Sequence, residues 1–195
     1  MKIGVLDLQG SVTEHINMLK KIETVIPVRV KYKDQIERID GLIIPGGEST
    51  TISKLLKSFD LMDILKKRIK RGMPIWGTCA GMILLAKKID GSDNAHLKVM
   101  DIDVKRNAYG SQLDSFLIED KIPDISKKSI PLVFIRAPYI TNVSNDVKIL
   151  KKVNEKIVAA KQKNILVTSF HPELTGNDCV HKYFIRNFFN NNFLL

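Results

Sequence analysis

The stretch Pro74-Ile75-Trp76-Gly77-Thr78-Cys79-Ala80-Gly81-Met82 decides which fold the rest of the chain is expected to form. Its first half predicts a buried strand, and the apolar residues that follow predict a buried helix from Met82 that ends at Lys87-Lys88. A cysteine between two glycines, placed between strand and helix, is typical of a nucleophile elbow, whose sharp turn exposes the reactive side chain. The helix N-terminus would favour the thiolate of Cys79. The alternative is a small apolar residue that is simply buried there.

The chain before this stretch alternates predicted strands with predicted helices. Strands are expected at residues 3–8, 25–30 and 40–45, and helices at residues 11–21, 53–59 and 61–71. Ser11 and Glu14 fit a capping box at the start of the first helix. The continuous apolar run at 40–45 is typical of a parallel strand covered on both faces, and Pro27 favours an edge position or a strand start at 25–30. The alternation predicts an α/β sheet with right-handed crossovers.

Beyond Gly91 the sequence instead alternates apolar and polar residues, which predicts antiparallel strands. Strands are expected at residues 99–106, 113–118, 132–135, 147–150, 156–161 and 165–170, with a turn at 107–110 and a final helix at about 180–189. The last three strands are expected to form a meander, with Gln162-Lys163-Asn164 as a tight connection. A chain of 195 residues can bury a core of its own, so we predict a single domain over residues 1–195.

Composition points to a reducing compartment. The two cysteines, Cys79 and Cys179, cannot form a disulfide framework. The first eight residues are typical of a strand and lack the features of a signal peptide. No apolar run approaches the roughly 20 residues needed to span a bilayer. We therefore expect a cytoplasmic protein that does not contact a membrane.

The chain carries a formal net charge of +10 and has a sequence pI near 9.6, which raises nucleic acid as a partner. Its lysines are dispersed in pairs along the chain and form no compact basic block interleaved with aromatic residues. Solvated helix faces and turns explain this pattern more simply. We expect no nucleic-acid partner, and a basic, non-enzymatic nucleic-acid-binding module is retained as an alternative.

A reactive thiolate requires a base, and the base requires a residue that orients it. Three of the four histidines lie in unremarkable contexts: His15 in the first helix, His96 in a polar loop, and His181 at the start of the last helix, where a surface or capping role is expected. His171 directly follows the strand at 165–170, at the edge where ligand sites of parallel sheets gather. Glu173 is close enough in sequence to fix the tautomer of His171. We predict that Cys79, His171 and Glu173 meet, although a surface histidine at a strand end is the alternative.

Acyl-transfer chemistry also requires donors for an oxyanion. Gly46-Gly47 follows the predicted strand at 40–45 and can present backbone N–H groups toward the neighbouring end of the strand that leads to Cys79. An ordinary glycine turn is the alternative.

Six blocks of sequence carry a resemblance to a known family. Three of them resemble the class I (triad) glutamine amidotransferases: Gly77-Thr78-Cys79-Ala80-Gly81, Pro45-Gly46-Gly47-Glu48-Ser49-Thr50 and Phe170-His171-Pro172-Glu173. Three more resemble the glutaminase subunits of pyridoxal 5′-phosphate synthase: Leu8-Gln9-Gly10, Arg106-Asn107-Ala108-Tyr109-Gly110 and Ile135-Arg136-Ala137-Pro138. The match runs in order from about Gly4 to Glu173. The resulting expectation is a flavodoxin-like three-layer sandwich, with a mostly parallel central sheet and added antiparallel strands.

The resemblance implies a role for each residue of the triad. Cys79 would attack the side-chain amide of glutamine, form a γ-glutamyl thioester and release ammonia. His171 would take the thiol proton, deliver it to the leaving amine and then activate water, while Glu173 orients His171. The amides of Gly47 and Ala80 would hold the oxyanion.

The resemblance also implies the residues that bind glutamine: Gly47, Glu48, Ser49, Arg106, Ile135 and Arg136. A guanidinium suits the α-carboxylate of the substrate because it can donate two parallel hydrogen bonds. For Arg106 the alternative is a surface ion pair on an alternating strand. Gln9 resembles the family glutamine near the oxyanion loop, in the region that meets the synthase, although a simple turn residue is the alternative.

The implied partner is a (β/α)₈-barrel synthase, in a large hetero-oligomer, that builds pyridoxal phosphate from two sugar phosphates. Ammonia would reach it through a channel, and the pyridoxal phosphate would be made by that partner, so no cofactor and no metal is expected in this chain. The chain departs from the family at Ser111, where an arginine is expected, and any contact of that arginine is in doubt.

Two further alternatives remain. A glutaminase subunit of another amidotransferase complex would share the elbow and triad, but the flanks Thr78 and Ala80 and the block at 106–110 argue against it. A peptidase or chaperone of the DJ-1 type would share the cysteine elbow without requiring Arg136 or the arrangement at residues 171–173.

Overall fold

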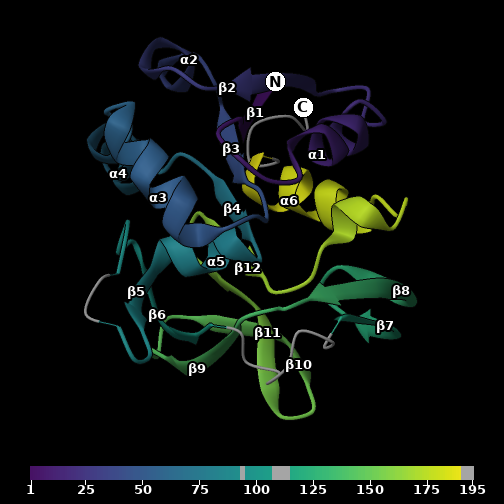
Figure 1. The fold of residues 1–195 in the computed structure, drawn as a ribbon. Coiled ribbons are helices and arrows are strands. Elements are labelled where there is room, and N and C mark those ends of the chain that lie inside the picture. The colour runs from purple at the N-terminus through teal and green to yellow at the C-terminus, as the bar shows by residue number, and fades with distance from the viewer. Residues whose placement is uncertain (93–94, 107–114, 190–195) are drawn as a thin grey trace.

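The computed structural model describes residues 1–92, 95–106 and 115–189. This part of the chain contains a ten-stranded sheet and a separate two-stranded sheet, with helices on both faces of the larger one (Figure 1). The larger sheet divides into a parallel half and an antiparallel extension. None of the helices in the described ranges is both long and apolar enough to cross a membrane.

The parallel half consists of five strands: β1 (Lys2–Leu6), β2 (Ile26–Val30), β3 (Gly41–Ile44), β4 (Ile75–Thr78) and β12 (Ile165–Thr168). They lie in the order β2-β1-β3-β4-β12, which in chain order is the 2-1-3-4-5 arrangement of flavodoxin-like folds. The predicted fold class is therefore confirmed. Every residue of β3, β4 and β12 is buried, as expected of parallel strands covered on both faces. The strand that contains Pro27, β2, is at an edge as predicted.

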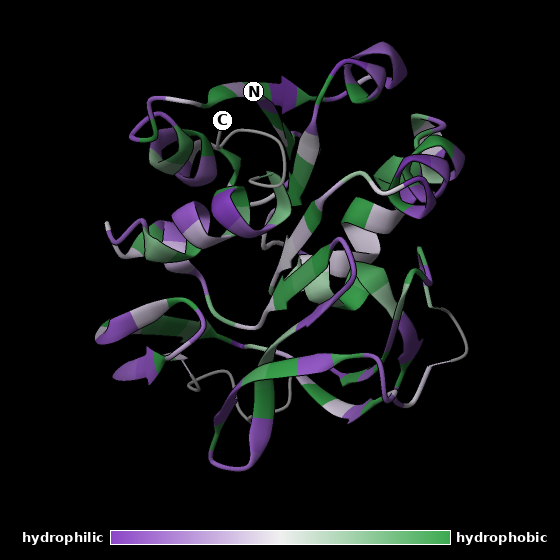
Figure 2. Ribbon diagram, turned by 180° about the vertical axis from the view of Figure 1, so that it is seen from behind, coloured by the Kyte–Doolittle hydropathy of each residue, from purple (hydrophilic) through white to green (hydrophobic). Residues whose placement is uncertain are grey.

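Helices form the two outer layers. One face carries α1 (Val12–Leu19) and α6 (Cys179–Phe189), and the other carries α2 (Lys33–Glu37), α3 (Ser49–Ser58), α4 (Met62–Lys70) and α5 (Ala80–Leu85) (Figure 1). Because side chains alternate along a strand, Ile43 packs in the core beneath α1 and α6, whereas Leu42 and Ile44 pack in the core on the opposite face. Figure 2 shows the central strands as mostly hydrophobic and the outermost helical turns as mostly hydrophilic.

The antiparallel extension begins at β12. It contains β11 (Lys156–Gln162), β9 (Tyr139–Val143) and β6 (Met100–Lys105), which pair antiparallel, with β10 (Lys148–Val153) paired to β11. At its outer edge β5 (Ala86–Ile89) pairs parallel to β6. A separate antiparallel hairpin is formed by β7 (Ser115–Ile122) and β8 (Ser126–Ile135). The predicted β10-β11-β12 meander is confirmed, and Lys163-Asn164 closes its last turn where Gln162 faces Ile165. The extension is therefore hydrogen-bonded to the parallel half through β12, the strand that leads to His171.

Several local predictions were wrong. The helix after Cys79 ends at Leu85, and Lys87-Lys88 belong to β5, which pairs with β6. The strand β9 and the short helix α2 were not predicted. Ser11 is the N-cap residue of α1, but its side chain makes no capping hydrogen bond; its hydroxyl instead donates to Glu173 Oε1 at 2.7 Å.

The turn expected at residues 107–110, the start of the strand expected at 113–118, and the departure at Ser111 lie outside the described residues. The other predicted strands and helices are present, with ends that differ by a few residues. The largest such difference is β8, which begins at Ser126 and not at Leu132. The helix α3 begins at Ser49 and not at Ser53, because Glu48 caps it.

Candidate active site

The turn at Cys79 has the geometry of a nucleophile elbow. Cys79 lies between β4 and α5 with φ 47° and ψ −101°, a backbone conformation that costs free energy for a residue with a side chain. Its N–H donates to the carbonyl of Thr168 at 2.8 Å, which ties the turn to β12. The flanking glycines are required by space: a Cβ on Gly81 would lie 2.4 Å from the carbonyl oxygen of Ile44, and one on Gly77 would lie 2.5 Å from the carbonyl carbon of Gly81.

His171 and Glu173 lie in the segment that directly follows the end of β12. The N–H of His171 donates to the carbonyl of Val133 at 2.8 Å, and its ring Nδ1 lies 2.7 Å from Glu173 Oε1. Glu173 belongs to a short 3₁₀ helix, Pro172–Leu174, and is 5% exposed. Since Nδ1 is engaged by the carboxylate, Nε2 is the ring nitrogen that remains for Cys79. The structure thus brings the three predicted triad residues together.

The charges of this group are strongly coupled. Burial alone lowers the pKa of His171, but its hydrogen bond with Cys79 and its contact with Glu173 outweigh burial and raise that pKa to about 10. Burial raises the pKa of Glu173, whereas His15, His171 and Ser11 together lower it to about 2. The resting site therefore favours an imidazolium beside an ionised carboxylate, the arrangement that stabilises a neighbouring thiolate.

The glycines after β3 allow the loop to approach the triad. A Cβ on Gly46 would lie 2.2 Å from His171 Cε1, and a Cβ on Gly47 would lie 2.4 Å from Gln9 Oε1. The same Gln9 oxygen accepts a hydrogen bond from the N–H of Glu48 at 2.8 Å. Gln9, which is exposed, therefore fixes the loop that was predicted to supply an oxyanion donor.

Glu48 and Ser49 lie at the start of α3. Both carboxylate oxygens of Glu48 accept hydrogen bonds from the helix N-terminus, from Thr50 N at 3.1 Å and from Thr51 N at 2.6 Å. Burial raises the pKa of Glu48, and the hydrogen bonds from Thr51 and Thr50 together outweigh it and lower the pKa. The side chain of Glu48 is therefore committed to capping α3, which leaves the backbone of the loop to face the cleft.

The remaining predicted binding residues come from the antiparallel extension and the hairpin. Arg106 follows β6, and its Nη2 donates to His96 Nε2 at 3.1 Å. Ile135 ends β8, and its carbonyl oxygen lies 4.0 Å from Cys79 Sγ. Arg136 is exposed and has φ 43°, so it sits on a strained turn beside the sulfur.

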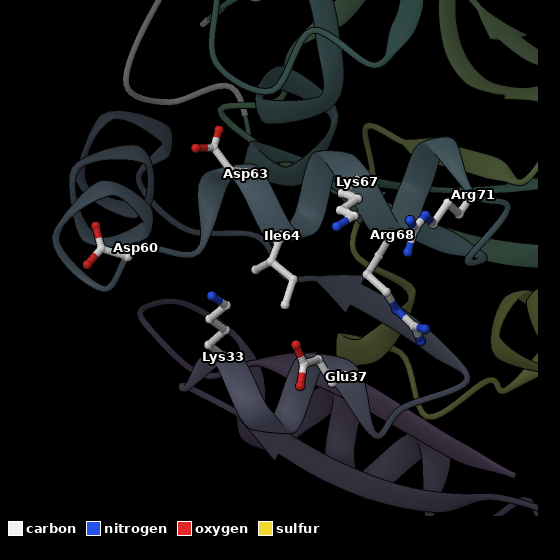
Figure 3. A pocket seen from close by; sticks show the side chains of 8 residues that line it. All are labelled: Lys33, Glu37, Asp60, Asp63, Ile64, Lys67, Arg68 and Arg71. Atoms are coloured by element: carbon white, nitrogen blue, oxygen red, sulfur yellow. The ribbon is translucent and has the colours of Figure 1, made fainter.

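These residues line one cleft of about 490 Å³. Its lining includes the predicted nucleophile and base, both predicted oxyanion donors and all of the predicted glutamine-binding residues: Cys79, His171, Gly47, Ala80, Glu48, Ser49, Arg106, Ile135 and Arg136. Gln9 also lines it, and Glu173 lies behind His171. A second cavity, of about 550 Å³, lies between α2 and α4 and is lined mainly by charged side chains of both signs (Figure 3). It holds no cysteine or histidine, so the smaller cleft is the candidate active site.

Two histidines near the triad were not predicted. His15 and His181 are fully buried, so the expected surface or capping role of His181 was wrong. His15 Nε2 lies 3.5 Å from Glu173 Oε2, and His15 Nδ1 lies 3.0 Å from His181 Nε2. A signal was present in the sequence: His181 lies three and four residues before the apolar Phe184 and Ile185, on the buried face of α6.

Comparison with known proteins identifies the class of protein to which this cleft belongs. The SNO glutamine amidotransferase family matches residues 5–190. A solved structure described as a glutamine amidotransferase superposes with a TM-score of 0.88 at 39% sequence identity, covering 94% of this chain and 97% of that chain. The chain belongs to the SNO glutamine amidotransferase family.

Individual relatives narrow the class further. The pyridoxal 5′-phosphate synthase subunit PdxT of Clostridium botulinum (strain Loch Maree / Type A3) is 62% identical over 191 residues, which are 98% of this chain and 99% of the relative. The protein of the same name from Clostridium kluyveri is 56% identical over 185 residues, 95% of this chain and 98% of the relative. The resemblance noted in the six sequence blocks is thus confirmed at the level of the family.

Proposed function

We propose that this chain is the glutaminase subunit of pyridoxal 5′-phosphate synthase in vitamin B6 biosynthesis, and that it hydrolyses L-glutamine to L-glutamate and ammonia at Cys79. The observation that carries the proposal is the convergence of Cys79, His171 and Glu173 beside the Gly46-Gly47 loop, in one cleft at the ends of parallel strands. All of residues 1–195 act as one glutamine amidotransferase domain in this proposal.

The first half of the reaction forms a thioester. The Cys79 thiolate attacks the side-chain amide carbon of glutamine, and the amide oxygen becomes an oxyanion held by the N–H groups of Gly47 and Ala80. His171 donates the proton on Nε2 to the amide nitrogen. The C–N bond then breaks, ammonia leaves, and a γ-glutamyl thioester remains on Cys79.

The second half regenerates the thiolate. A water molecule attacks the thioester carbonyl while His171, now neutral, takes one of its protons on Nε2. The C–S bond breaks, glutamate leaves, and the imidazolium–thiolate pair is restored. Glu173 keeps Nδ1 of His171 protonated in both halves, so that Nε2 is always the nitrogen that exchanges the proton.

Charge and position support roles for the substrate-binding residues. Arg106 and Arg136 line the cleft from different elements and supply the cationic groups for the α-carboxylate of glutamine. The loop at residues 47–49 and the end of β8 at Ile135 line the same cleft near the sulfur. Glutamine would therefore lie with its amide at Cys79 and its carboxylate at the two guanidinium groups.

The partner in this proposal is a (β/α)₈-barrel synthase subunit in a large hetero-oligomer in the cytoplasm. Ammonia must reach it before it is protonated, so the cleft is expected to open toward a channel into that subunit. Gln9 is exposed and fixes the loop at Glu48. It is therefore suited to transmit docking of the synthase to the oxyanion donors.

The test is ammonia release from glutamine in the presence of the synthase, with Cys79→Ala compared with Cys179→Ala. Cys179 lies at the start of α6 and does not line the cleft, so its variant controls for the loss of a thiol. We expect Cys79→Ala to lose at least about 10⁴-fold in kcat, and Cys179→Ala to match the wild type. Wild-type turnover in Cys79→Ala would refute the proposal.

A further inference from the structure

Behind the proposed triad, α1 and α6 bring two buried histidines into contact. His15 and His181 are both 0% exposed. The two rings share a hydrogen bond between His15 Nδ1 and His181 Nε2, which lie 3.0 Å apart. His15 Nε2 faces two oxygens, Thr78 Oγ1 at 3.2 Å and Glu173 Oε2 at 3.5 Å. The pair therefore connects the carboxylate of the triad to the residue that precedes Cys79.

The hydrogen-bond pattern determines which nitrogens carry protons. Burial lowers the pKa of His15 and lowers that of His181 well below its usual value, so each ring is neutral and has one N–H. His181 Nδ1 has no hydrogen-bond partner among the described residues. A buried N–H without an acceptor costs more than an unused lone pair, so His181 carries its proton on Nε2. It donates that proton to His15 Nδ1, which leaves the His15 proton on Nε2.

This tautomer places the N–H of His15 between Thr78 Oγ1, at 3.2 Å, and Glu173 Oε2, at 3.5 Å. Of these two oxygens, only Glu173 Oε2 is an ionised acceptor. Glu173 Oε1 faces two groups, His171 Nδ1 and Ser11 Oγ, each at 2.7 Å. Glu173 Oε2 is buried and makes no hydrogen bond within the described residues, and His15 Nε2 contacts it at 3.5 Å. A buried, ionised oxygen requires such a donor to remain in place.

We propose that His15, with its tautomer set by His181, is a positioning residue that holds the Glu173 carboxylate so that Oε1 stays bound to His171. The proposal rests on the proposed function, since it assigns His15 a task only if Glu173 orients a catalytic base. Because His15 also contacts Thr78, it fixes the carboxylate relative to the strand that carries the nucleophile.

The surroundings restrict both rings to this arrangement. The indole of Trp76 meets both imidazoles edge-on, with ring centroids 5.5 Å from His15 and 4.9 Å from His181. The titratable groups that act on His15 are Glu173, His171 and Glu14, and those that act on His181 are His15, Glu173 and Lys21. Only Glu173 offers an acceptor within 3.5 Å of His15 Nε2 among the titratable side chains that the structure describes.

Two substitutions of His15 separate its two nitrogens. Glutamine places an amide nitrogen near the position of Nε2, so His15→Gln keeps a donor toward Glu173. Asparagine is one carbon shorter and reproduces only the Nδ1 position, so His15→Asn keeps an acceptor for His181 but loses that donor. A role limited to packing predicts no such distinction in the chemistry of Cys79.

The readout is the rate of Cys79 alkylation by iodoacetamide as a function of pH, in the full-length chain carrying Cys179→Ala. Without the His15 donor, Glu173 becomes protonated or rotates, and either change weakens its pairing with His171. The thiolate then forms at higher pH. We expect the midpoint for His15→Asn to rise by at least about one pH unit, and kcat with the synthase to fall about 10–100-fold at unchanged KM. We expect His15→Gln to stay close to the wild type.

Gln162→Leu is the matched control, because Gln162 is also buried and its amide joins Asp101 and Asp146 at 2.7 Å each, away from the cleft. It should lower the melting temperature without moving the alkylation midpoint. Equal midpoints for His15→Asn and the wild type would overturn the proposal. Should His15→Asn fail to fold, nitrogen-15 NMR of the wild-type imidazoles decides: a proton on His15 Nδ1 contradicts the proposal, and one on Nε2 supports it. Both readouts proceed without turnover, so a failed ammonia assay would count against the proposed function alone.

Discussion

The parallel half of the sheet and its antiparallel extension contribute different parts of the cleft. The parallel strands supply the groups proposed to react: Cys79 after β4, His171 and Glu173 after β12, and the glycine loop after β3. The extension and the β7–β8 hairpin supply the groups proposed to recognise the substrate, Arg106 after β6 and Ile135-Arg136 at the end of β8.

The two regions also differ in how firmly they hold those groups. Cys79, His171 and Glu173 are 8%, 7% and 5% exposed, and each is bound to backbone or side chains from another element. Arg136 is exposed on a turn. Proton transfer tolerates little displacement, whereas a guanidinium on a long side chain can adjust to a carboxylate. We infer that the parallel half fixes the chemistry and that the extension and the hairpin set the affinity for the substrate.

Among substitutions that leave every functional group in place, the largest effect should come from disturbing the parallel half. In Gly46→Ala the new Cβ would lie 2.2 Å from His171 Cε1, and His171 is held by Glu173 and cannot move aside. We expect kcat to fall about 10²-fold with little change in KM, as measured by ammonia release.

Gly47→Ala is the control for this prediction. Its Cβ would instead meet Oε1 of Gln9 at 2.4 Å, the end of an exposed side chain that can rotate away at the cost of one hydrogen bond, with Glu48 N. Its effect on kcat should be smaller than that of Gly46→Ala, and the reverse order would contradict the proposed importance of the position of His171.

A different kinetic signature is expected from the antiparallel extension. In Arg106→Lys a forked guanidinium is replaced by a single ammonium, which loses the paired hydrogen bonds to a carboxylate. We expect KM for glutamine to rise about tenfold while kcat changes little. A fall in kcat with unchanged KM would place Arg106 with the reacting groups and remove the distinction between the two halves.

The smallest effect concerns stability and its dependence on pH. The pKa of Glu173 is lowered from 4.5 to about 2, so its contribution to stability is present above pH 4.5 and is lost as the pH falls toward about 2. The pKa of His171 is raised from 6.5 to about 10, so its contribution is present below pH 6.5 and is lost as the pH rises toward about 10.

Glu173→Gln weakens both contributions. The free energy of unfolding should therefore differ most from that of the wild type between pH 4.5 and 6.5, by roughly 1–3 kcal/mol, and the gap should narrow on either side. Urea unfolding at a series of pH values measures it, and a gap independent of pH would contradict the proposed ion pair.

The parallel half could be predicted from the sequence because its signals are local. Continuous apolar runs such as Leu42–Ile44, and the glycines around Cys79, report burial and a sharp turn directly. The strand β9 was missed because only Ile140 among its five residues is buried. Lys87-Lys88 suggested a helix end because two charged residues follow an apolar run, whereas they are the exposed residues of an edge strand.

The partners of the triad could not be predicted for a different reason. Ser11 fits a local cap, yet it bonds to Glu173, 162 positions away, and His15 bonds to His181, 166 positions away. The first contact arises because the start of α1 packs against the 3₁₀ helix at Pro172–Leu174, and the second because α1 and α6 pack on the same face of the sheet. No local pattern encodes such a meeting, and only the three-dimensional arrangement shows it.

The central claim is that Cys79 carries the acyl group of glutamine during turnover. Acid quenching of the wild-type chain with its synthase during turnover of glutamine, followed by peptide mass spectrometry, tests it directly. We predict a γ-glutamyl adduct on the peptide that contains Cys79, removed by hydroxylamine and absent in Cys79→Ala. Ammonia release without such an adduct, or an adduct on Cys179 alone, would contradict the account.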